Sequence, residues 1–148
     1  MSAHPRRPVI LLALATIAAS ACTELPRAAW QLRFENDTLQ ARALFVRSTV
    51  FGGTCDSGAI VYQADTVLDV PSPPPPLLDP GSYCLEGRAR DSSCNWFAEG
   101  RLDIALPVDD GTILTVVLRS GAESAECDAS ACMAGLCAGE PSPDGGSG

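Results

Sequence analysis

Seven cysteines constrain the fold of this chain more than any other feature of its sequence. Cys22 lies near the N-terminus, and the six that follow are Cys55, Cys84, Cys94, Cys127, Cys132 and Cys137. In an oxidising compartment disulfides are the default, but an odd number of cysteines cannot pair completely within one chain. The six later cysteines fall into two groups of three, Cys55, Cys84 and Cys94 in the middle of the chain and Cys127, Cys132 and Cys137 towards its C-terminus. Because three is odd, their complete pairing requires at least one bridge between the groups.

The first 21 residues predict export from the cytosol. Arg6 and Arg7 precede an apolar run over 9–19 in which only Thr16 is polar. This run has the length of a signal-peptide core, whereas a helix that crosses a bilayer needs about 20 apolar residues. We therefore expect residues 1–21 to be removed as a signal peptide.

The residues at the end of this leader are compatible with two kinds of processing. Ala19 and Ala21 satisfy the small-x-small rule of ordinary signal-peptide cleavage. The sequence Ala19-Ser20-Ala21-Cys22 also resembles the lipobox of bacterial lipoproteins, although that family prefers leucine where Ala19 stands. The resemblance implies lipidation of the Cys22 sulfur and acylation of the new N-terminus, and several acyl chains anchor a protein firmly. Lipidation would also leave six cysteines to pair.

The expected location and partners follow from this leader and from the charge. Thr23 replaces the aspartate that often retains lipoproteins at the inner membrane, which by resemblance implies the outer membrane or cell surface. A soluble periplasmic or secreted protein is the alternative. The net charge is −8, and removal of Arg6 and Arg7 with the leader takes it to −10. The lipid on Cys22 implies a membrane partner. Because a negatively charged surface repels phosphate, we expect no nucleic-acid partner. An envelope protein or glycan partner stays open.

The segment 29–119 predicts an all-β domain between a tether over 22–28 and a cysteine-rich tail over 120–138. Alternating polarity and β-branched residues indicate strands, and no segment predicts a convincing helix. The expected strands cover 30–35, 41–51, 59–62, 66–70, 82–90, 96–106 and 112–118. About seven short strands are typical of an antiparallel two-sheet sandwich, here followed by an irregular tail. Residues 139–148 should be disordered.

Two proline-containing segments add to this picture. Pro71–Pro76 predicts an extended polyproline crossover between sheets, because proline lacks the backbone donor that a strand needs. Pro80-Gly81-Ser82-Tyr83 resembles the start of a strand in transthyretin-like and PEGA-like domains of bacterial surface proteins. This second resemblance implies a fold and nothing about activity.

The hairpin over 82–106 leads to a specific set of bridges. Its alternation places Tyr83 and Leu85 on one face, with Trp96 on the apolar face of the return strand and Phe97 on the opposite one. A turn near Ser92 would bring Cys84 opposite roughly Arg101, far from Cys94. This disfavours a Cys84–Cys94 bridge. Because Cys55 and Cys94 both lie in expected loops, we expect a Cys55–Cys94 bridge, a bridge from Cys84 to the tail, and a small loop closed by the remaining two cysteines. Three tail cysteines without a nearby histidine favour disulfides over zinc, so no metal is expected.

Several reaction classes lack the residues they need. The only histidine, His4, lies in the leader, and the chain has no lysine. This excludes histidine-assisted nucleophiles and Schiff-base chemistry from the mature chain, so we expect no enzyme, no catalytic residue and no cofactor. Glu86 and Glu99 could form a carboxylate pair of the kind that hydrolyses glycosides, although Arg88 and Arg101 beside them favour a solvated sheet face.

Two acidic motifs are interpreted as turns, Asp109-Asp110-Gly111 in preference to a calcium loop and Asn36-Asp37-Thr38 in preference to a glycosylation site.

Three functions remain open on the residues alone. The first is a non-catalytic envelope lipoprotein that binds a partner or has a structural role. The second is a secreted, disulfide-braced inhibitor of a protease or lysozyme, and the third is a carboxylate-based glycan hydrolase.

Overall fold

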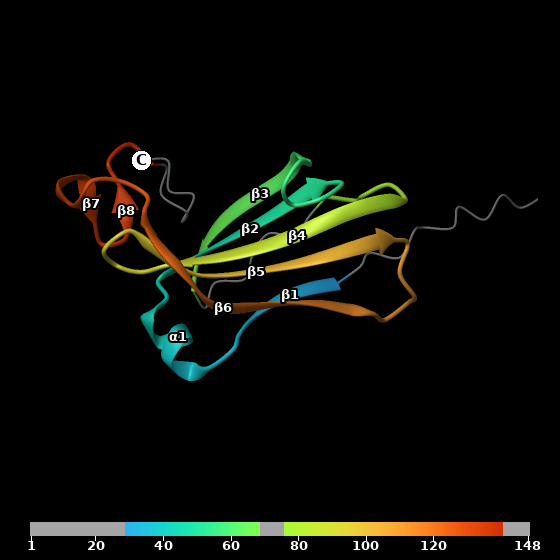
Figure 1. Ribbon diagram of the computed structural model, residues 1–148, viewed down its shortest axis with the longest axis horizontal. Helices are drawn as coiled ribbons and strands as arrows, with labels where there is room; N and C mark the ends of the chain where they lie inside the picture. The colour runs from blue at the N-terminus through green and yellow to red at the C-terminus, as the bar shows by residue number, and fades with distance from the viewer. Residues whose placement is uncertain (1–28, 69–75, 141–148) are drawn as a thin grey trace, which may run out of the picture.

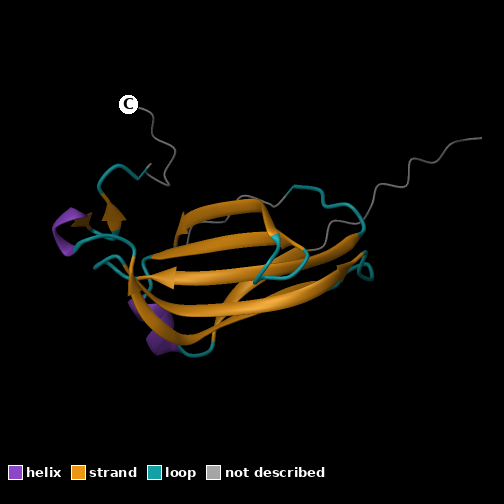
Figure 2. Cartoon of the chain, turned by 45° about the horizontal axis from the view of Figure 1, so that its top comes forward, coloured by secondary structure: helices purple, strands orange, loops and turns teal. Residues whose placement is uncertain are grey.

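The computed structural model describes residues 29–68 and 76–140, and most of this part of the chain is strand (Figures 1 and 2). The elements are β1 (Ala29–Phe34), α1 (Asp37–Arg42), β2 (Phe45–Gly52), β3 (Ala59–Val67), β4 (Gly81–Arg90), β5 (Asn95–Leu106), β6 (Ile113–Ala125), a 3₁₀ turn (Ala129–Ala131), β7 (Cys132–Met133) and β8 (Leu136–Cys137). The expectation of a β-rich fold is confirmed. The leader, Cys22 and residues 71–75 of the polyproline stretch lie outside the described residues.

Six strands form one curled sheet in the order β1-β6-β5-β4-β2-β3. β1 runs parallel to β6 and the other pairs are antiparallel, while β7 and β8 form a separate hairpin. The expected sandwich of about seven strands is not confirmed, because twist lets this single sheet curl around its own core. A Cβ atom at Gly87 of β4 would lie 2.7 Å from Leu32 of β1, which shows how closely the first strand approaches the middle of the sheet.

The core lies on the inner face of the curled sheet, where apolar residues follow the strand alternation. It is formed by Val46, Val50, Leu85, Ala89, Phe97, Ala98, Val116 and Leu118, together with Ala43 after α1. Leu85 and Ala89 point inward from β4 as expected, and Glu86 and Arg88 between them point to the outer face. The outer face therefore carries the charged residues of the sheet.

Three elements differ from the expected ones. Residues 37–42 form a short helix because the Asn36 side chain accepts a hydrogen bond of 3.0 Å from the Leu39 N–H and caps it. The two strands expected within 59–70 are one continuous strand, β3. β6 continues to Ala125, past the expected boundary at 119, because its second half pairs with the start of β5.

A bulge reverses the expected orientation of two aromatic residues. The register between β4 and β5 shifts between Ala89 and Arg90, so that Arg90 pairs with Trp96 and Ala89 with Ala98. The extra residue, Phe97, turns into the core, and Trp96 joins the charged side chains outside. Our assignment of Trp96 to the apolar face is therefore wrong, because strict alternation does not survive a bulge.

Candidate functional site

Trp96 is the centre of a compact group of side chains on the outer face. The guanidinium carbons of Arg47 and Arg88 each lie 4.8 Å from the centroid of its ring, and that of Arg90 lies 5.1 Å away. Trp96 is 2% exposed and Arg90 only 1%. We call Arg47, Arg88, Arg90 and Trp96 the arginine–tryptophan cluster. Cation–π contacts of this kind each contribute about 0.5–2 kcal/mol, more when water is excluded.

The strand register explains why the three arginines meet. Arg47 of β2 is the direct cross-strand partner of Arg88 on β4, and Phe45 is the partner of Arg90. All of them point to the outer face because they alternate with the inward residues of their strands. Like charges directly opposite each other are destabilising, so this arrangement requires acidic partners nearby.

Those acidic partners come from β3 and from the end of the chain. Asp65 of β3 accepts two hydrogen bonds of 2.7 Å from Arg47. Glu126 accepts hydrogen bonds from the Trp96 indole N–H and from Arg47, and Glu140 accepts one of 3.1 Å from Arg90. We call residues 126–140 the C-terminal segment. The carboxylates of Glu126 and Glu140 therefore hold this segment against the cluster, and the Gly135 turn packs on the Phe45 ring beside them.

The electrostatics of these contacts keep the acidic and basic partners charged. Burial by itself raises the pKa of Glu140, but hydrogen bonds from Arg90 and from the Cys137 N–H, the latter 2.7 Å long, hold that pKa below its ordinary value. The hydrogen bonds from Arg47 to Asp65 raise the pKa of Arg47. Arg88 differs from Arg47 and Arg90 because its Nη2 donates to a hydroxyl, that of Ser124 at 3.4 Å, and not to a carboxylate. The buried Nε atoms of both Arg88 and Arg90 have no hydrogen-bond partner among the described residues.

Six cysteines form three bridges, Cys55–Cys84, Cys94–Cys132 and Cys127–Cys137, with Cα–Cα distances of 5.2, 5.9 and 6.0 Å. The Cys94–Cys132 bridge joins the sheet to the C-terminal segment, which confirms the inter-group bridge that parity requires. The small loop between two tail cysteines is also confirmed, by Cys127–Cys137.

The expected Cys55–Cys94 bridge and the bridge from Cys84 to the tail are wrong. Cys84 lies opposite Phe51 of β2, and Cys55 follows this strand in the next loop, so the pairing of β2 with β4 brings Cys55 to Cys84. Across the hairpin Cys84 faces Asp103, two residues from the position expected. Cys94 lies at the other end of the hairpin, next to the C-terminal segment.

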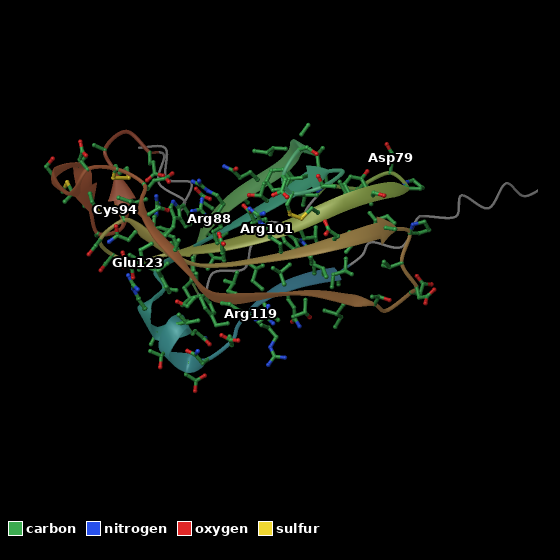
Figure 3. The ribbon with its side chains drawn as sticks, in the orientation of Figure 1. Asp79, Arg88, Cys94, Arg101, Arg119 and Glu123 are labelled. Carbon is green, nitrogen blue, oxygen red and sulfur yellow. A yellow bond between two sulfur atoms is a disulfide. The ribbon has the colours of Figure 1, made fainter. Side chains whose placement is uncertain are left out.

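The acidic side chains considered for catalysis or metal binding are placed as follows. Glu86 is the cross-strand partner of Arg101 and accepts a hydrogen bond of 2.9 Å from it, and Arg101 also contacts Asp56. Glu99 is the cross-strand partner of Arg88. Figure 3 shows Arg101 over the middle of the sheet and Arg88 nearer the end that carries Cys94. The Glu86 carboxylate is thus engaged in an ion pair with one of the two arginines expected beside it, but its side chain is only 12% exposed and not solvated as expected.

The Asp109-Asp110-Gly111 motif forms a turn. The Thr112 N–H donates to the Asp109 carbonyl at 3.1 Å, and Gly111 has a φ of 80°. Because this positive φ favours glycine, the turn itself requires Gly111.

Sequence reasoning found the cysteines but not the arginine–tryptophan cluster. Its arginines lie at alternate positions on predicted strands, but the pairing of β2 with β4 is non-local and the bulge at Phe97 leaves no sequence signal that we recognised. Within the described residues, neither α1 nor the 3₁₀ turn is long and apolar enough to cross a membrane. Comparison of the chain with protein-family models, curated proteins and solved structures gives no match.

Proposed function

We propose that this chain is an exported lipoprotein of the bacterial cell envelope, anchored through Cys22, whose folded domain is a non-catalytic binding or structural module. One observation supports the anchor most directly. The structure pairs all six cysteines of its described residues with one another, so Cys22 is the seventh cysteine and has no partner among them. That is the distribution expected if the Cys22 sulfur carries a lipid.

The structure also supports a rigid module in an oxidising compartment. Its bridges connect residues 29, 38 and 10 positions apart. Closed loops of these sizes stabilise a small domain by about 2–4 kcal/mol each. Ion pairs with arginines engage the acidic residues beside the arginine–tryptophan cluster and beside Arg101. Carboxylates engaged in this way support a structural or binding module over a carboxylate-based enzyme. The transthyretin-like or PEGA-like resemblance of residues 80–83 and the outer-membrane location are parts of the same proposal.

Membrane fractionation and intact mass test the anchor in one experiment. The native protein should be found with the membranes, be released by detergent and have the mass of a chain that begins at Cys22 with attached acyl groups. Cys22→Ser should be soluble and keep three disulfides, shown by a mass increase of about 6 Da on reduction, one hydrogen for each sulfur in the three bridges. Cys55→Ser is the control, because it removes a bridge and should stay in the membrane. An unacylated native protein would refute the proposal.

A secreted inhibitor is the second candidate, favoured by the loop that carries Cys55. The Cys55–Cys84 bridge joins this loop to β4, while the neighbouring Asp56 side chain is 87% exposed. A loop fixed in this way could enter the active site of an enzyme at low entropic cost. Stoichiometric titration against panels of proteases and lysozymes would test this, and an inhibitor of this kind should lose its effect when Cys55 is replaced.

A further inference from the structure

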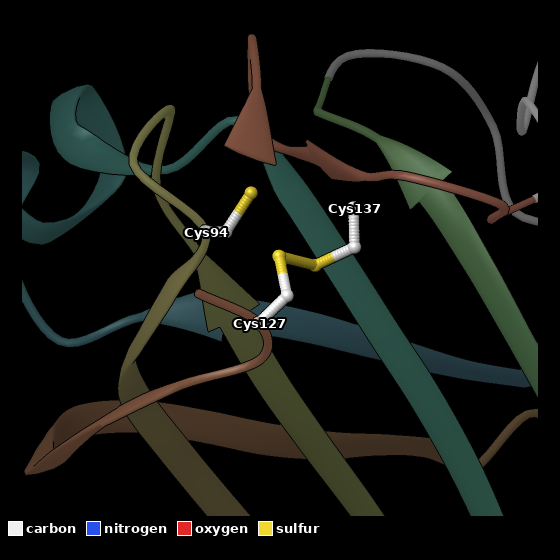
Figure 4. A group of neighbouring side chains, drawn as sticks. All are labelled: Cys94, Cys127 and Cys137. Carbon is white, nitrogen blue, oxygen red and sulfur yellow. A yellow bond between two sulfur atoms is a disulfide. The ribbon is translucent and has the colours of Figure 1, made fainter. Parts of the chain in front are cut away.

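We propose that Cys94–Cys132 and Cys127–Cys137 form a thiol–disulfide exchange site, in which reduction of one bridge shifts the other. The Sγ atoms of Cys94, Cys127 and Cys137 all lie within 4.8 Å of one another (Figure 4). A sulfur of one bridge therefore lies beside both sulfurs of the other. The proposal depends on the paired cysteines alone and does not require the lipid anchor.

Backbone hydrogen bonds explain this arrangement and keep it in place. The β5–β6 ladder pairs Asn95 with Ala125, and the Glu126 N–H donates to the Cys94 carbonyl at 2.9 Å. Cys127, the next residue, is therefore held beside Cys94. In the β7–β8 hairpin Cys132 is the direct cross-strand partner of Cys137. Ala134 and Gly135 have φ values of 51° and 82°, as a tight hairpin turn requires.

The four cysteines thus come from two backbone pairs. The end of the β5–β6 ladder holds Cys94 beside Cys127, and the β7–β8 hairpin holds Cys132 beside Cys137. Each bridge joins a cysteine of the ladder to a cysteine of the hairpin. Because backbone pairing also holds the two cysteines of each pair together, other disulfide pairings can form without unfolding of the sheet.

The exchange begins at the more accessible sulfur. Cys94 is 0% exposed, whereas Cys132 is half-buried. A dithiol reductant attacks the Cys132 sulfur, the bond to Cys94 breaks, and Cys94 leaves as a thiolate. The second thiol of the reductant then cleaves the mixed disulfide and releases Cys132 as a thiol. Two electrons have passed from the dithiol to the chain; one of its two protons is on Cys132, and the other is in the solvent while Cys94 is a thiolate.

The second step shifts the remaining bridge. The Cys94 thiolate attacks the Cys127 sulfur, a Cys94–Cys127 bond forms, and Cys137 leaves as a thiolate that takes up a proton. Attack on Cys137 instead releases Cys127. A Cys94–Cys127 bond leaves the hairpin with no bridge, whereas a Cys94–Cys137 bond leaves it with one bridge in place of two. Reduction followed by exchange therefore loosens the C-terminal segment from the arginine–tryptophan cluster.

Single cysteine variants of the full chain test the exchange without added reductant. Cys132→Ser leaves a Cys94 thiol beside the Cys127–Cys137 bridge. Peptide mapping after trapping the thiols in acid should find Cys94 linked to Cys127 or Cys137, in addition to the native pair. Cys55→Ser is the matched control, because it leaves a Cys84 thiol at the other end of the hairpin, and its two remaining bridges should stay native.

A converse variant and the native chain complete the test. Cys137→Ser leaves a Cys127 thiol, which should displace Cys132 from Cys94. In the native chain treated with one equivalent of dithiothreitol, trapped thiols should appear first at Cys94 and Cys132, and the Cys94 thiol should later be replaced by one at Cys137 or Cys127. The proposal is overturned if folded variants, judged by near-ultraviolet circular dichroism, keep one native bridge and one fixed thiol. If the variants do not fold, thiols that stay on Cys94 and Cys132 in the native chain overturn it.

Discussion

Glu140 offers a quantitative test of how the C-terminal segment is held. Glu140→Gln keeps the shape of the side chain but removes the negative charge that faces Arg90, which is 1% exposed. Loss of one partner from a fully buried ion pair costs about 3–5 kcal/mol. The Glu140 side chain is 22% exposed, so water replaces part of the lost interaction. We therefore expect a loss of about 2 kcal/mol in the free energy of unfolding, or about 8 °C in Tm.

Denaturant unfolding followed by tryptophan fluorescence measures this loss, since Trp96 lies in the same cluster. Glu123→Gln is the matched control, because Glu123 also pairs with an arginine, Arg42, but its side chain is 60% exposed. Exposed pairs contribute about 0–1 kcal/mol. Equal effects of the two substitutions would show that Glu140 does not compensate a buried charge.

The same pair predicts a pH dependence. In the folded chain the pKa of Glu140 lies below its ordinary value of 4.5. Its stabilising contribution is therefore complete above about pH 4.5 and is lost as the pH falls through the lower pKa of the folded state. The difference in stability between native chain and Glu140→Gln should be largest at neutral pH and narrow in acid. A difference that does not change with pH would contradict this assignment.

Two further substitutions test the sheet. Asp91→Asn removes the charge of a carboxylate that accepts hydrogen bonds from Arg42 at 2.7 Å and from the backbone N–H groups of Ser93 and Asn95. The free energy of unfolding in urea at pH 7 should fall by about 2 kcal/mol. Because the pKa of folded Asp91 is lowered, this difference should shrink below pH 3.8. Gly100→Ala would place a Cβ 2.2 Å from the Val117 carbonyl oxygen and should cost about 2–3 kcal/mol by thermal unfolding, whereas Gly81→Ala, with no contact closer than 3.7 Å, should change the Tm little.

The alternation of polar and apolar residues correctly predicted the strands that form between neighbouring segments of the chain. The β4–β5 hairpin was expected over 82–90 and 96–106 and lies over 81–90 and 95–106, because alternation along each strand and the turn between them are set by neighbouring residues. The short helix after Asn36 was missed because six residues give too little periodicity to distinguish a helix from a turn.

The disulfides and the cluster depend on which strands become neighbours, and the sequence carries little information about that. Parity required a bridge to the tail, and the structure has one. The choice of Cys84 for Cys55 follows from the pairing of β2 with β4, which skips β3. The position of Trp96 follows from a single extra residue in β5, and one residue is enough to move a side chain to the opposite face.

The positions of the bridges divide the domain into a cross-linked part and a part held by noncovalent contacts alone. Every bridge lies between Cys55 and Cys137, so β1, α1 and β2 all precede the first bridged cysteine. β1 is an edge strand, joined to the sheet only through β6. In a protein anchored at Cys22, a load from the membrane would reach β1 before any other strand. Under such a load β1 would detach from β6 first and uncover Leu118, while the rest of the sheet stays folded.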